Sequence, residues 1–320
     1  MNDIRELRGQ RLALYCFGNR LNGAYPYIIS YLNPKIETDI NKLNKYDYVL
    51  FSWSYCWQDI GWVDKVKIPI IIGGKHAELL NIHDKLPRLG GHIEYWTKRL
   101  DEVESPRWCK IIPNYKITLR LNPYCEWLMV YSGDGCYWRK CTFCNVDYPY
   151  PYTQFQPEYV AEVIKLANSY GKIAGLSGES HTVAWLRAVE SYLSPNNRYD
   201  VYCRADQEGW QDLHNANKIF IGLEYLSDSV LRRVKKGVSA QQIMETILEI
   251  QSLGINVEST VIIDLWETED EREEHYGNIR KLLLETRRAG LYSGQFSLLE
   301  TRLTAKDKML YYLKNGEVIR

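Results

Sequence analysis

The sequence predicts an α/β protein in two parts: a domain built on a parallel sheet over residues 1–125, and a partial barrel of six strand–helix units, (βα)6, over residues 126–320. Two observations favour this fold class. Short apolar runs of strand length alternate along the chain with longer segments whose apolar residues recur at helical spacing. Many of the runs are continuously apolar, which is typical of parallel strands covered on both faces.

In the first part, apolar runs predict four strands, and a helical segment lies between the first two. The strands are expected at residues 11–17, 46–53, 67–74 and 92–96, and the helix at residues 25–32. The third strand ends in the glycine pair Gly73 and Gly74. Ligands bind parallel sheets at the carboxyl ends of the strands, where glycines allow close approach to the backbone. The pair is therefore a candidate ligand contact.

In the second part, strand and helix patterns alternate six times. The strands are expected at residues 127–132, 172–176, 200–204, 218–224, 256–265 and 294–299. The helices are expected at residues 156–170, 181–193, 243–253, 271–288 and 305–313, with a short one ending at residue 231. Chemistry on such barrels takes place at the carboxyl ends of the strands. Polar residues that directly follow these strands are therefore interpreted as one candidate site.

Composition and charge narrow the function classes. The chain has 40 Lys and Arg against 40 Asp and Glu, so its net charge is zero, and no global basic field attracts nucleic acid. No stretch approaches the roughly 18 apolar residues of a membrane span, and the first residues do not form a signal peptide. A cytoplasmic location is expected. In such a setting, eight cysteines favour metal or redox chemistry over disulfides.

Three of these cysteines, Cys136, Cys141 and Cys144, form a C-x4-C-x2-C loop directly after the first strand of the second part. Thiolates of this kind bind zinc or an iron–sulfur cluster. A closed structural zinc site takes four protein ligands, and the next cysteines, Cys125 and Cys203, lie outside the loop. Three ligands leave one coordination position open, as a catalytic centre does. Structural zinc remains the alternative for the loop alone.

The loop resembles the cluster-binding loop of the radical S-adenosylmethionine (radical SAM) superfamily. The usual spacing there is C-x3-C-x2-C, with an aromatic residue before the last cysteine, a position that Phe143 fills. The longer first gap is also found in subfamilies with an N-terminal cobalamin-binding domain. The resemblance implies that Cys136, Cys141 and Cys144 hold a [4Fe–4S] cluster whose open iron binds SAM. Tyr137, Trp138 and Phe143 would then shield the cluster, or simply pack the loop.

Two further segments resemble SAM-binding motifs of the superfamily. Ser177-Gly178-Glu179 follows the second barrel strand and is similar to a Gly-Gly-Glu segment that receives the SAM ammonium group, with Ser177 in place of the first glycine. Arg204 follows the third strand and matches an arginine that pairs with the SAM carboxylate, for which a guanidinium is suited. The alternatives are a solvent-facing acidic turn for Glu179 and an ordinary salt bridge for Arg204, to Asp206 or Glu224.

The fourth and fifth strands carry the remaining resemblance. Gly222-Leu223-Glu224, followed by Lys236-Gly237, is similar to a pattern of the radical SAM class that includes methylthiotransferases and cobalamin-linked enzymes, and implies Glu224 as a functional carboxylate. The segment from Thr260 to Glu267 resembles a Gly-x-Ile-x-Gly-x-x-Glu motif that lines the adenine. Ile262 and Glu267 match this motif, whereas Thr260 and Asp264 replace its glycines.

The first part resembles the Rossmann-like cobalamin-binding domain that precedes the barrel in this class. The resemblance implies Gly73 and Gly74 as residues that lie against the corrin. The chain has no Asp-x-His-x-x-Gly motif, which supplies a histidine to cobalt in some cobalamin proteins, although members of the class often lack it. A domain without corrin, vestigial or used for substrate recognition, is the alternative. His76, after the glycine pair, is interpreted as a hydrogen-bonded loop residue.

Together these resemblances imply a radical SAM enzyme that cleaves SAM to a 5′-deoxyadenosyl radical. The expected outcome is cobalamin-dependent methylation of an unactivated carbon on a small molecule or peptide. One alternative is cobalamin-independent hydrogen abstraction leading to dehydrogenation, epimerisation or crosslinking. Another is a non-enzymatic metal-binding protein. Expected partners are the substrate and an electron donor such as a flavodoxin or ferredoxin; no membrane or nucleic-acid partner is expected.

Overall fold

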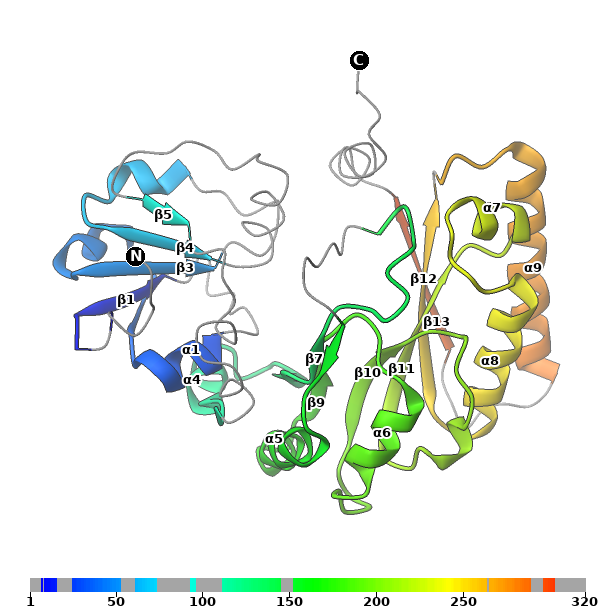
Figure 1. Cartoon of the computed structure of the whole chain (residues 1–320), viewed down its shortest axis with the longest axis horizontal. Coiled ribbons are helices and arrows are strands. Elements are labelled where there is room, and N and C mark those ends of the chain that lie inside the picture. The colour runs from blue at the N-terminus through cyan, green and yellow to red at the C-terminus, as the bar shows by residue number, and fades with distance from the viewer. Residues whose placement is uncertain are drawn as a thin grey trace. The chain divides into compact units, whose positions relative to one another are not determined.

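In the computed structural model the chain forms two compact units, Met1–Leu128 and Met129–Arg320, and each is described by itself (Figure 1). The structure describes residue 7 and residues 9–15, 25–52, 61–73, 93–95, 111–144, 152–263, 265–288 and 296–302. Both units contain a parallel sheet with helices. The predicted α/β class, with a Rossmann-like sheet followed by a partial barrel, is confirmed.

The N-terminal unit has a five-stranded sheet in the order β2-β1-β3-β4-β5, and its strand pairs are parallel. The strands are β1 (Leu12–Tyr15), β2 (Lys35–Glu37), β3 (Tyr48–Ser52), β4 (Ile70–Gly73) and β5 (Ile93–Tyr95). The helices are α1 (Tyr25–Leu32) and α4 (Tyr115–Leu121), with 3-10 turns η3 (Ile40–Lys45) and η4 (Gly61–Lys65). This strand order is that of a doubly wound fold, which binds ligands where the order reverses, here between β1 and β3.

Apolar clusters cover both faces of this sheet. Successive residues of a strand point to opposite faces, so Ile70 and Ile72 pack with Trp62 in one cluster, whereas Ile71 packs with Ile29 in the other. Burial of both faces explains why the strands are continuously apolar in sequence. The four strands and the helix predicted in this part are confirmed within the described residues.

Strand β2 and helix α4 of the N-terminal unit were not predicted. The edge strand β2 has only three residues, too few for a periodic pattern, and its first residue, Lys35, is exposed. Helix α4 has only seven residues, so the apolar spacing typical of a helix hardly repeats along it. Cys16, Cys56, Gly74, His76, Cys109 and the predicted helix over residues 305–313 lie outside the described residues.

The second sheet has six strands that follow the order of the chain, β13-β12-β11-β10-β9-β6. They are β6 (Trp127–Val130), β9 (Ile173–Leu176), β10 (Tyr199–Cys203), β11 (Ala216–Glu224), β12 (Asn256–Ile263) and β13 (Phe296–Arg302). The helices between them are α5 (Pro157–Ser169), α6 (Val183–Glu190), α7 (Asp228–Arg233), α8 (Ala240–Ser252) and α9 (Glu269–Arg288). Each strand pairs with the next one in sequence, as a partial barrel requires.

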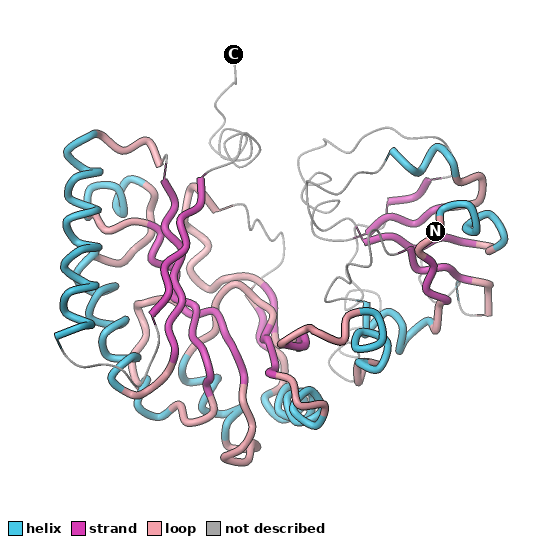
Figure 2. The backbone as a smooth tube through the Cα atoms, turned by 180° about the vertical axis from the view of Figure 1, so that it is seen from behind, coloured by secondary structure: helices cyan, strands magenta, loops and turns pink. Residues whose placement is uncertain are grey.

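Helices cover one face of this sheet. Helix α5 packs on β9, and α8 packs on both β12 and α9; α8 and α9 lie on the same side of the strands in both views (Figures 1 and 2). In β11, Ile219, Ile221 and Leu223 are fully buried, whereas the alternate residues are only half-buried. The strands of the barrel therefore bury one face fully and leave the other, more polar face partly open.

Local chemistry sets several boundaries that differ from the prediction. Helix α6 begins after Thr182, whose Oγ1 accepts from the Trp185 N–H at 3.3 Å. Helix α8 begins three residues early, after Ser239, whose Oγ accepts from the Gln242 N–H at 3.1 Å. Both are side-chain N-caps, which satisfy N–H groups that the first helical turn leaves free. Within the described residues, no helix has the length and apolar character needed to cross a membrane.

The first barrel strand also ends earlier than predicted, at Val130. Beginning three residues further on, β7 (Gly133–Asp134) pairs antiparallel with β8 (Thr153–Gln154). A Cβ on Gly133 would lie 2.5 Å from the Thr153 carbonyl oxygen, so glycine is required for this close pairing. The short ladder directs the chain into the cysteine loop.

Candidate functional site

The loop that carries Cys136, Cys141 and Cys144 follows β6 and β7 at the carboxyl end of the second sheet. All three are free thiols and half-buried. Gly135 (φ 73°) and Arg139 (φ 52°) have left-handed backbone conformations, and the Cys144 N–H donates to the Cys141 carbonyl at 3.3 Å. These turns fold the loop back on itself and keep the three cysteines on one short segment.

The surroundings of the loop are suited to thiolates. Burial raises the pKa of the Cys141 thiol, while the nearby charges of Lys236 and Arg204 lower it; cationic neighbours stabilise thiolates and the anionic centres they bind. Within the described parts of the chain, no three His, Cys, Asp or Glu side chains lie close enough to hold a single metal ion. A cluster binds each thiolate to a different iron, so it takes a wider set of thiols than one ion does. Three free thiols on one loop are donors of the kind that an iron–sulfur cluster takes.

The other two described cysteines lie elsewhere. Cys203 is buried at the end of β10, and burial raises its pKa far above the ordinary value, so its thiol is a neutral core group. Cys125 is half-buried on the connection before β6. His181, the next histidine after the loop, is fully buried. Its Nε2 lies 2.9 Å from Ser132 Oγ, and burial lowers its pKa to about 4.

A segment more than ninety residues away holds the cysteine loop in place. The Thr142 N–H donates to the Val234 carbonyl at 3.0 Å, and the Trp138 Nε1–H donates to the Lys235 carbonyl at 2.7 Å. Gly237 (φ 76°) packs directly on the indole, because a Cβ there would lie 2.0 Å from the ring. The segment 234–237 therefore fixes the loop through two backbone carbonyls and one glycine.

Arg204 lies at the end of β10 and is buried. Its Nε and Nη2 donate to both carboxylate oxygens of Asp206 at 3.1 to 3.2 Å, and Nη2 also donates to the Lys236 carbonyl at 2.8 Å. The salt bridge to Asp206, the alternative role named for Arg204, is therefore formed. Nη1 makes no hydrogen bond within the described residues, so one edge of the guanidinium remains available. Binding of a SAM carboxylate there stays a prediction.

Asp206 also ties Arg204 to the cysteine loop. The Tyr137 hydroxyl donates to Asp206 Oδ1, and the Arg204 guanidinium lies 4.9 Å from the centre of the Trp138 ring. Burial alone would raise the pKa of Asp206, but hydrogen bonds from Tyr137 and Arg204 outweigh it and lower the pKa. Asp206 is therefore an ionised carboxylate that orients both the arginine and the loop.

Glu224, at the end of β11, pairs with Lys236, whose Nζ lies 3.0 Å from Glu224 Oε1. Glu224 has a left-handed backbone (φ 59°), and the pairing of β11 with β12 is irregular between Ile221 and Glu224. Left-handed non-glycine residues and bulges cluster at functional sites. The irregularity brings the Glu224 carboxylate toward Lys236. The carboxylate also lies close enough to Cys141 for its charge to raise the pKa of that thiol.

The segment Ser177-Gly178-Glu179 also lies against the cysteine loop. The Ser177 N–H donates to the Val130 carbonyl at 2.8 Å, and the Glu179 N–H donates to the Gly135 carbonyl at 3.3 Å. Gly178 has φ 106°, and a Cβ there would meet the His181 ring at 2.9 Å. The segment therefore needs its glycine and joins β9 to the start of the loop.

The remaining predicted residues are placed as follows. Phe143 lies in the cysteine loop, with its ring centre 5.9 Å from Lys236 Nζ. Ile262 lies near the end of β12, half-buried, and pairs in register with Thr301 of β13. Gly73 ends β4 in the N-terminal unit, opposite Ser52. The strand ends of the C-terminal unit thus bring the three cysteines together with the segment 177–179, Arg204 and Glu224.

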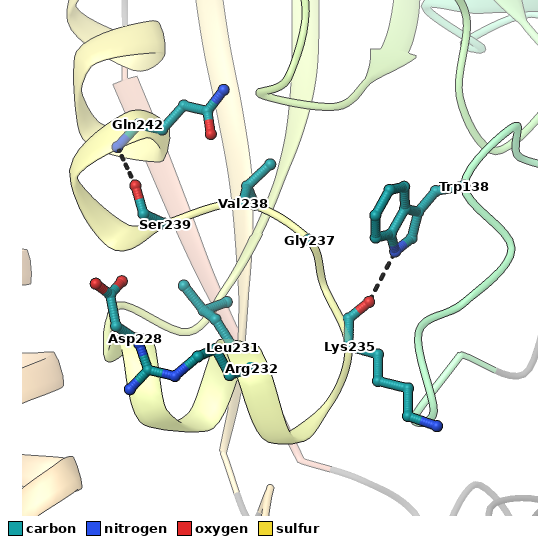
Figure 3. A pocket seen from close by; sticks show the side chains of 9 residues that line it. All are labelled: Trp138, Asp228, Leu231, Arg232, Lys235, Gly237, Val238, Ser239 and Gln242. Atoms are coloured by element: carbon teal, nitrogen blue, oxygen red, sulfur yellow. Dashed lines mark hydrogen bonds between the residues drawn. The ribbon is translucent and has the colours of Figure 1, made fainter.

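A pocket of about 400 Å³ opens beside this group (Figure 3). It is lined by Trp138, Asp228, Leu231, Arg232, Lys235, Gly237, Val238, Ser239 and Gln242. None of the predicted cofactor residues lines it. Trp138, which lies between Cys136 and Cys141, is the link between the pocket and the cysteine loop.

Several contacts of this site were not predicted from sequence. Lys236 and Gly237 belong to the recognised motif. Their contacts, Lys236 with Glu224 and Gly237 with Trp138, join residues that are not neighbours in the sequence. Asp206 lies two residues after Arg204, and this spacing was the only signal for it. The contact of Ser132 with His181 has no sequence signal, since serine before a strand-end loop is common.

Comparison with known proteins gives a family match over a little less than half of the chain and a fold. Residues 130–278 match the family described as the Radical SAM superfamily. The cobalamin-dependent S-adenosylmethionine radical enzyme OxsB, with aqua-cobalamin and S-adenosylmethionine bound, is similar with a TM-score of 0.67 and 16% identity, covering 98% of this chain and 56% of that chain. Its selenomethionine-labelled apo form gives a TM-score of 0.65 and 17% identity.

The chain thus spans little more than half the length of these OxsB structures. At this identity the likeness shows the fold, over both units of the chain. No curated protein matches the sequence.

Proposed function

Since the chain carries a radical SAM domain in residues 130–278, we propose that it binds a [4Fe–4S] cluster through Cys136, Cys141 and Cys144 and cleaves SAM reductively. When bound, the cluster supplies one electron that splits SAM into methionine and a 5′-deoxyadenosyl radical, which abstracts hydrogen from an unreactive carbon. The observation that carries this proposal is the gathering of three half-buried free thiols with Lys236 and Arg204 at the carboxyl ends of the barrel strands.

The chain's own residues then bind and orient. The Glu179 carboxylate would receive the SAM ammonium group, because its backbone is hydrogen-bonded to Gly135 at the start of the cysteine loop. Arg204 would offer its free Nη1 edge to the SAM carboxylate while Asp206 holds Nε and Nη2, a charge-assisted arrangement. Ile262 would pack on the adenine. Glu224 and Lys236 would stay paired beside Cys141, so that their opposite charges offset each other there.

We further propose that the N-terminal unit binds cobalamin and that the reaction is methylation of an unactivated carbon on a small molecule or peptide. Two observations support this. The strand order β2-β1-β3-β4-β5 is that of a doubly wound sheet with a ligand crevice at its carboxyl edge. The fold of the whole chain is similar to that of OxsB, a cobalamin-dependent enzyme. Gly73 would lie against the corrin, together with Gly74.

Anaerobic reconstitution tests the proposal. The protein is incubated with iron and sulfide, then with hydroxocobalamin, and desalted before its absorption spectrum is recorded. We expect an iron–sulfur shoulder and retained corrin bands, and 5′-deoxyadenosine when SAM and dithionite are added. The triple variant Cys136→Ala/Cys141→Ala/Cys144→Ala should lose the iron, whereas Cys125→Ala should keep it.

The outcomes separate the alternatives. A cluster with SAM cleavage but no retained corrin would support hydrogen abstraction without cobalamin and would overturn the methylation proposal. Bound metal without sulfide and without SAM cleavage would instead indicate a metal-binding protein with no radical chemistry. Equal iron content in the triple variant and the parent protein would overturn the assignment of the cysteines.

A further inference from the structure

A buried serine and a buried histidine lie beside the segment Ser177-Gly178-Glu179. Ser132 follows β6, and His181 lies between β9 and α6; both side chains are almost completely buried. His181 Nε2 lies 2.9 Å from Ser132 Oγ. The proposed function gives neither residue a role, and their contacts with the segment indicate one.

Three hydrogen bonds join the end of β6 to Ser177. The Ser177 N–H donates to the Val130 carbonyl at 2.8 Å, and the Ser132 N–H donates to Ser177 Oγ at 3.2 Å. The Ser132 hydroxyl donates to the Ser177 carbonyl. Ser177 stands where the Gly-Gly-Glu motif has its first glycine, so the bond to its Oγ exists only because this chain departs from the motif.

The single hydroxyl proton of Ser132 fixes the tautomer of His181. A carbonyl oxygen can only accept, so the bond to Ser177 uses this proton. The Nε2 atom of His181 must then carry its own proton and donate it to Ser132 Oγ. Burial lowers the pKa of His181 to about 4, so the ring is neutral at pH 7 and its proton is on Nε2. The donors thus run in one direction, from His181 through Ser132 to the Ser177 carbonyl.

The ring of His181 also packs directly on Gly178. A Cβ on Gly178 would lie 2.9 Å from His181 Cε1, and its φ of 106° is a conformation that favours glycine. The ring is itself held in place. Its centre lies 5.1 Å from that of Trp185, and the His181 N–H donates to the Tyr202 carbonyl at 2.9 Å. The backbone of Gly178 therefore rests on a side chain that α6 and β10 fix.

Ser132 and His181 are not a nucleophile and its base, although they lie within hydrogen-bond distance. A nucleophilic serine is reached by its substrate and gives its proton to the histidine. Ser132 is fully buried, and its proton goes to the Ser177 carbonyl. The direction of these hydrogen bonds favours a role in holding the backbone.

We propose that Ser132 and His181 are positioning residues for SAM: with Ser177 they form a clamp that fixes the turn from which Glu179 presents its carboxylate. The Glu179 N–H donates to the Gly135 carbonyl at 3.3 Å, so the clamp holds one side of this turn and the start of the cysteine loop holds the other. The proposal rests on the proposed function, because it takes Glu179 as the residue that receives the SAM ammonium group. The clamp acts on SAM through Glu179 alone.

Binding of SAM to the reconstituted protein with an oxidised cluster tests the clamp, because SAM is then not cleaved. Equilibrium dialysis gives the Kd of SAM and of 5′-methylthioadenosine, which keeps the adenosine part but has no ammonium group and no carboxylate. Ser132→Ala and His181→Leu should each raise the Kd of SAM about tenfold, the effect of weakening one hydrogen bond to a charged group. Both should leave the Kd of 5′-methylthioadenosine unchanged. His181→Gln should raise the Kd of SAM by less, because glutamine retains an amide N–H donor.

The matched control is Asn215→Ala. Asn215 is buried at the amino end of β11, and its Nδ2 donates to the carbonyls of Ser194 and Asn197 at 2.7 and 3.0 Å. Its substitution also removes buried hydrogen bonds, but at the end of the strand far from the cysteine loop. Both Kd values should therefore stay as in the parent protein. An equal loss of SAM affinity in Asn215→Ala and Ser132→Ala would overturn the clamp, since general destabilisation would explain it.

A double-mutant cycle with Glu179 tests the route by which the clamp acts. In the Glu179→Gln background, Ser132→Ala should change the Kd of SAM by less than about twofold, because the carboxylate that the clamp positions is already absent. Turnover gives a second comparison. With dithionite, Ser132→Ala should raise the KM of SAM about tenfold and leave kcat for 5′-deoxyadenosine formation nearly unchanged. If Ser132→Ala does not fold, His181→Gln takes its place in both experiments.

The outcomes separate this proposal from the one on which it rests. A parent protein that binds no SAM would overturn the proposed function. A parent protein that binds SAM, with an unchanged Kd in Ser132→Ala and His181→Leu, would overturn the clamp alone. Equal losses of affinity for SAM and for 5′-methylthioadenosine would also overturn it, because the effect would not pass through the ammonium group. Additive effects of Ser132→Ala and Glu179→Gln would have the same meaning.

Discussion

Lys236 Nζ lies 3.0 Å from Glu224 Oε1, in a pair whose side chains are only 6% and 15% exposed. The pair crosses over Gly222, where a Cβ would lie 2.8 Å from Nζ and 2.9 Å from Oε1. A glycine two residues before the glutamate is therefore what allows the two charges to meet. The motif residues Gly222, Glu224 and Lys236 form one physical unit beside Cys141.

This pair should show a large energetic coupling. Glu224→Gln and Lys236→Met should each lower the free energy of unfolding of the apoprotein by about 2 to 3 kcal/mol, because each leaves a charge buried without its partner. The double variant should cost about 1 to 2 kcal/mol less than the sum of the two. Urea unfolding at pH 7 measures this cycle.

The pair Lys218–Glu258 is the matched control, with the same 3.0 Å separation but side chains 31% and 21% exposed. Its cycle, with Lys218→Met and Glu258→Gln, should give a coupling below about 1 kcal/mol, since solvent screens it. Equal couplings in the two cycles would show that burial does not strengthen the Lys236–Glu224 pair.

Gly237 should be far less tolerant of substitution than another glycine with the same backbone. Both Gly237 and Gly171 have positive φ, 76° and 69°, but a Cβ on Gly171 has no atom within 4 Å, whereas one on Gly237 would lie 2.0 Å from the Trp138 ring. Gly171→Ala should cost about 1 kcal/mol of unfolding free energy for backbone strain. Gly237→Ala should cost about 2 to 4 kcal/mol, because it also displaces the indole.

Combining Gly237→Ala with Trp138→Ala tests the cause. Trp138→Ala alone removes a hydrogen bond and the ring packing. In the Gly237→Ala background, Trp138→Ala should lower the free energy of unfolding by much less. Unfolding free energies of the four proteins give the comparison, and iron content after reconstitution reports on the loop. If the two substitutions are additive, the contact between ring and glycine does not hold the cysteine loop.

The sequence was sufficient for elements whose signal is local. The apolar spacing of Val160, Val163 and Ile164 predicted α5, and these side chains are fully buried. The cysteine loop was found because its three thiols lie within nine residues. What stayed hidden depends on distant contacts: Trp138 reaches Gly237 across about a hundred residues, and β7 and β8 are two residues each. No pattern of period 2 or 3.6 encodes such contacts.

Arg204 illustrates the same limit at the candidate site. The sequence indicated two roles for Arg204, a SAM contact or a salt bridge. It did not indicate which atoms of the guanidinium would serve each role. The structure shows the salt bridge to Asp206, and no described residue bonds Nη1, so the two roles need not compete. The atom that a guanidinium uses for each partner is a tertiary property, set here by Tyr137 and by the Lys236 carbonyl.

Glu271 should stabilise the start of α9 in a pH-dependent way. Its carboxylate accepts from Arg233 at 2.6 Å and from the Thr268 N–H at 2.8 Å, while the Glu271 N–H donates to Thr268 Oγ1 at 3.3 Å. This is a capping box. The hydrogen bond from Arg233 is the largest of the effects that lower the pKa of Glu271 to about 2.

Because this folded-state pKa lies below the ordinary 4.5 of a free glutamate, the stabilisation is present at neutral pH and is lost as pH falls from about 4.5 toward 2. Glu271→Gln should cost about 1 to 2 kcal/mol at pH 7. The difference from the parent protein should shrink at pH 4. Urea unfolding at pH 7, 5 and 4 tests this, with Glu273→Gln, an exposed residue of the same helix, as control. A difference that does not change with pH would contradict the assignment.

His181 should make the protein less stable in mild acid. It is fully buried beside Ser132 Oγ, and burial lowers its pKa to about 4, against an ordinary value of 6.5. Between these two values the unfolded chain binds the proton that the folded protein excludes, so stability falls as pH decreases from about 6.5 toward 4. At pH 5.5 this histidine alone should cost about 1 to 1.5 kcal/mol of unfolding free energy relative to pH 7.5.

The variant His181→Gln removes the titrating group and should flatten the stability profile by that amount. It should be less stable than the parent protein at pH 7.5, because the contact with Ser132 is weakened. His214→Gln, at an exposed position, should leave the slope of the profile unchanged. Urea unfolding of the three apoproteins at pH 7.5, 6.5 and 5.5 gives the slopes, and equal slopes for His181→Gln and the parent protein would mean that His181 accepts its proton without unfolding.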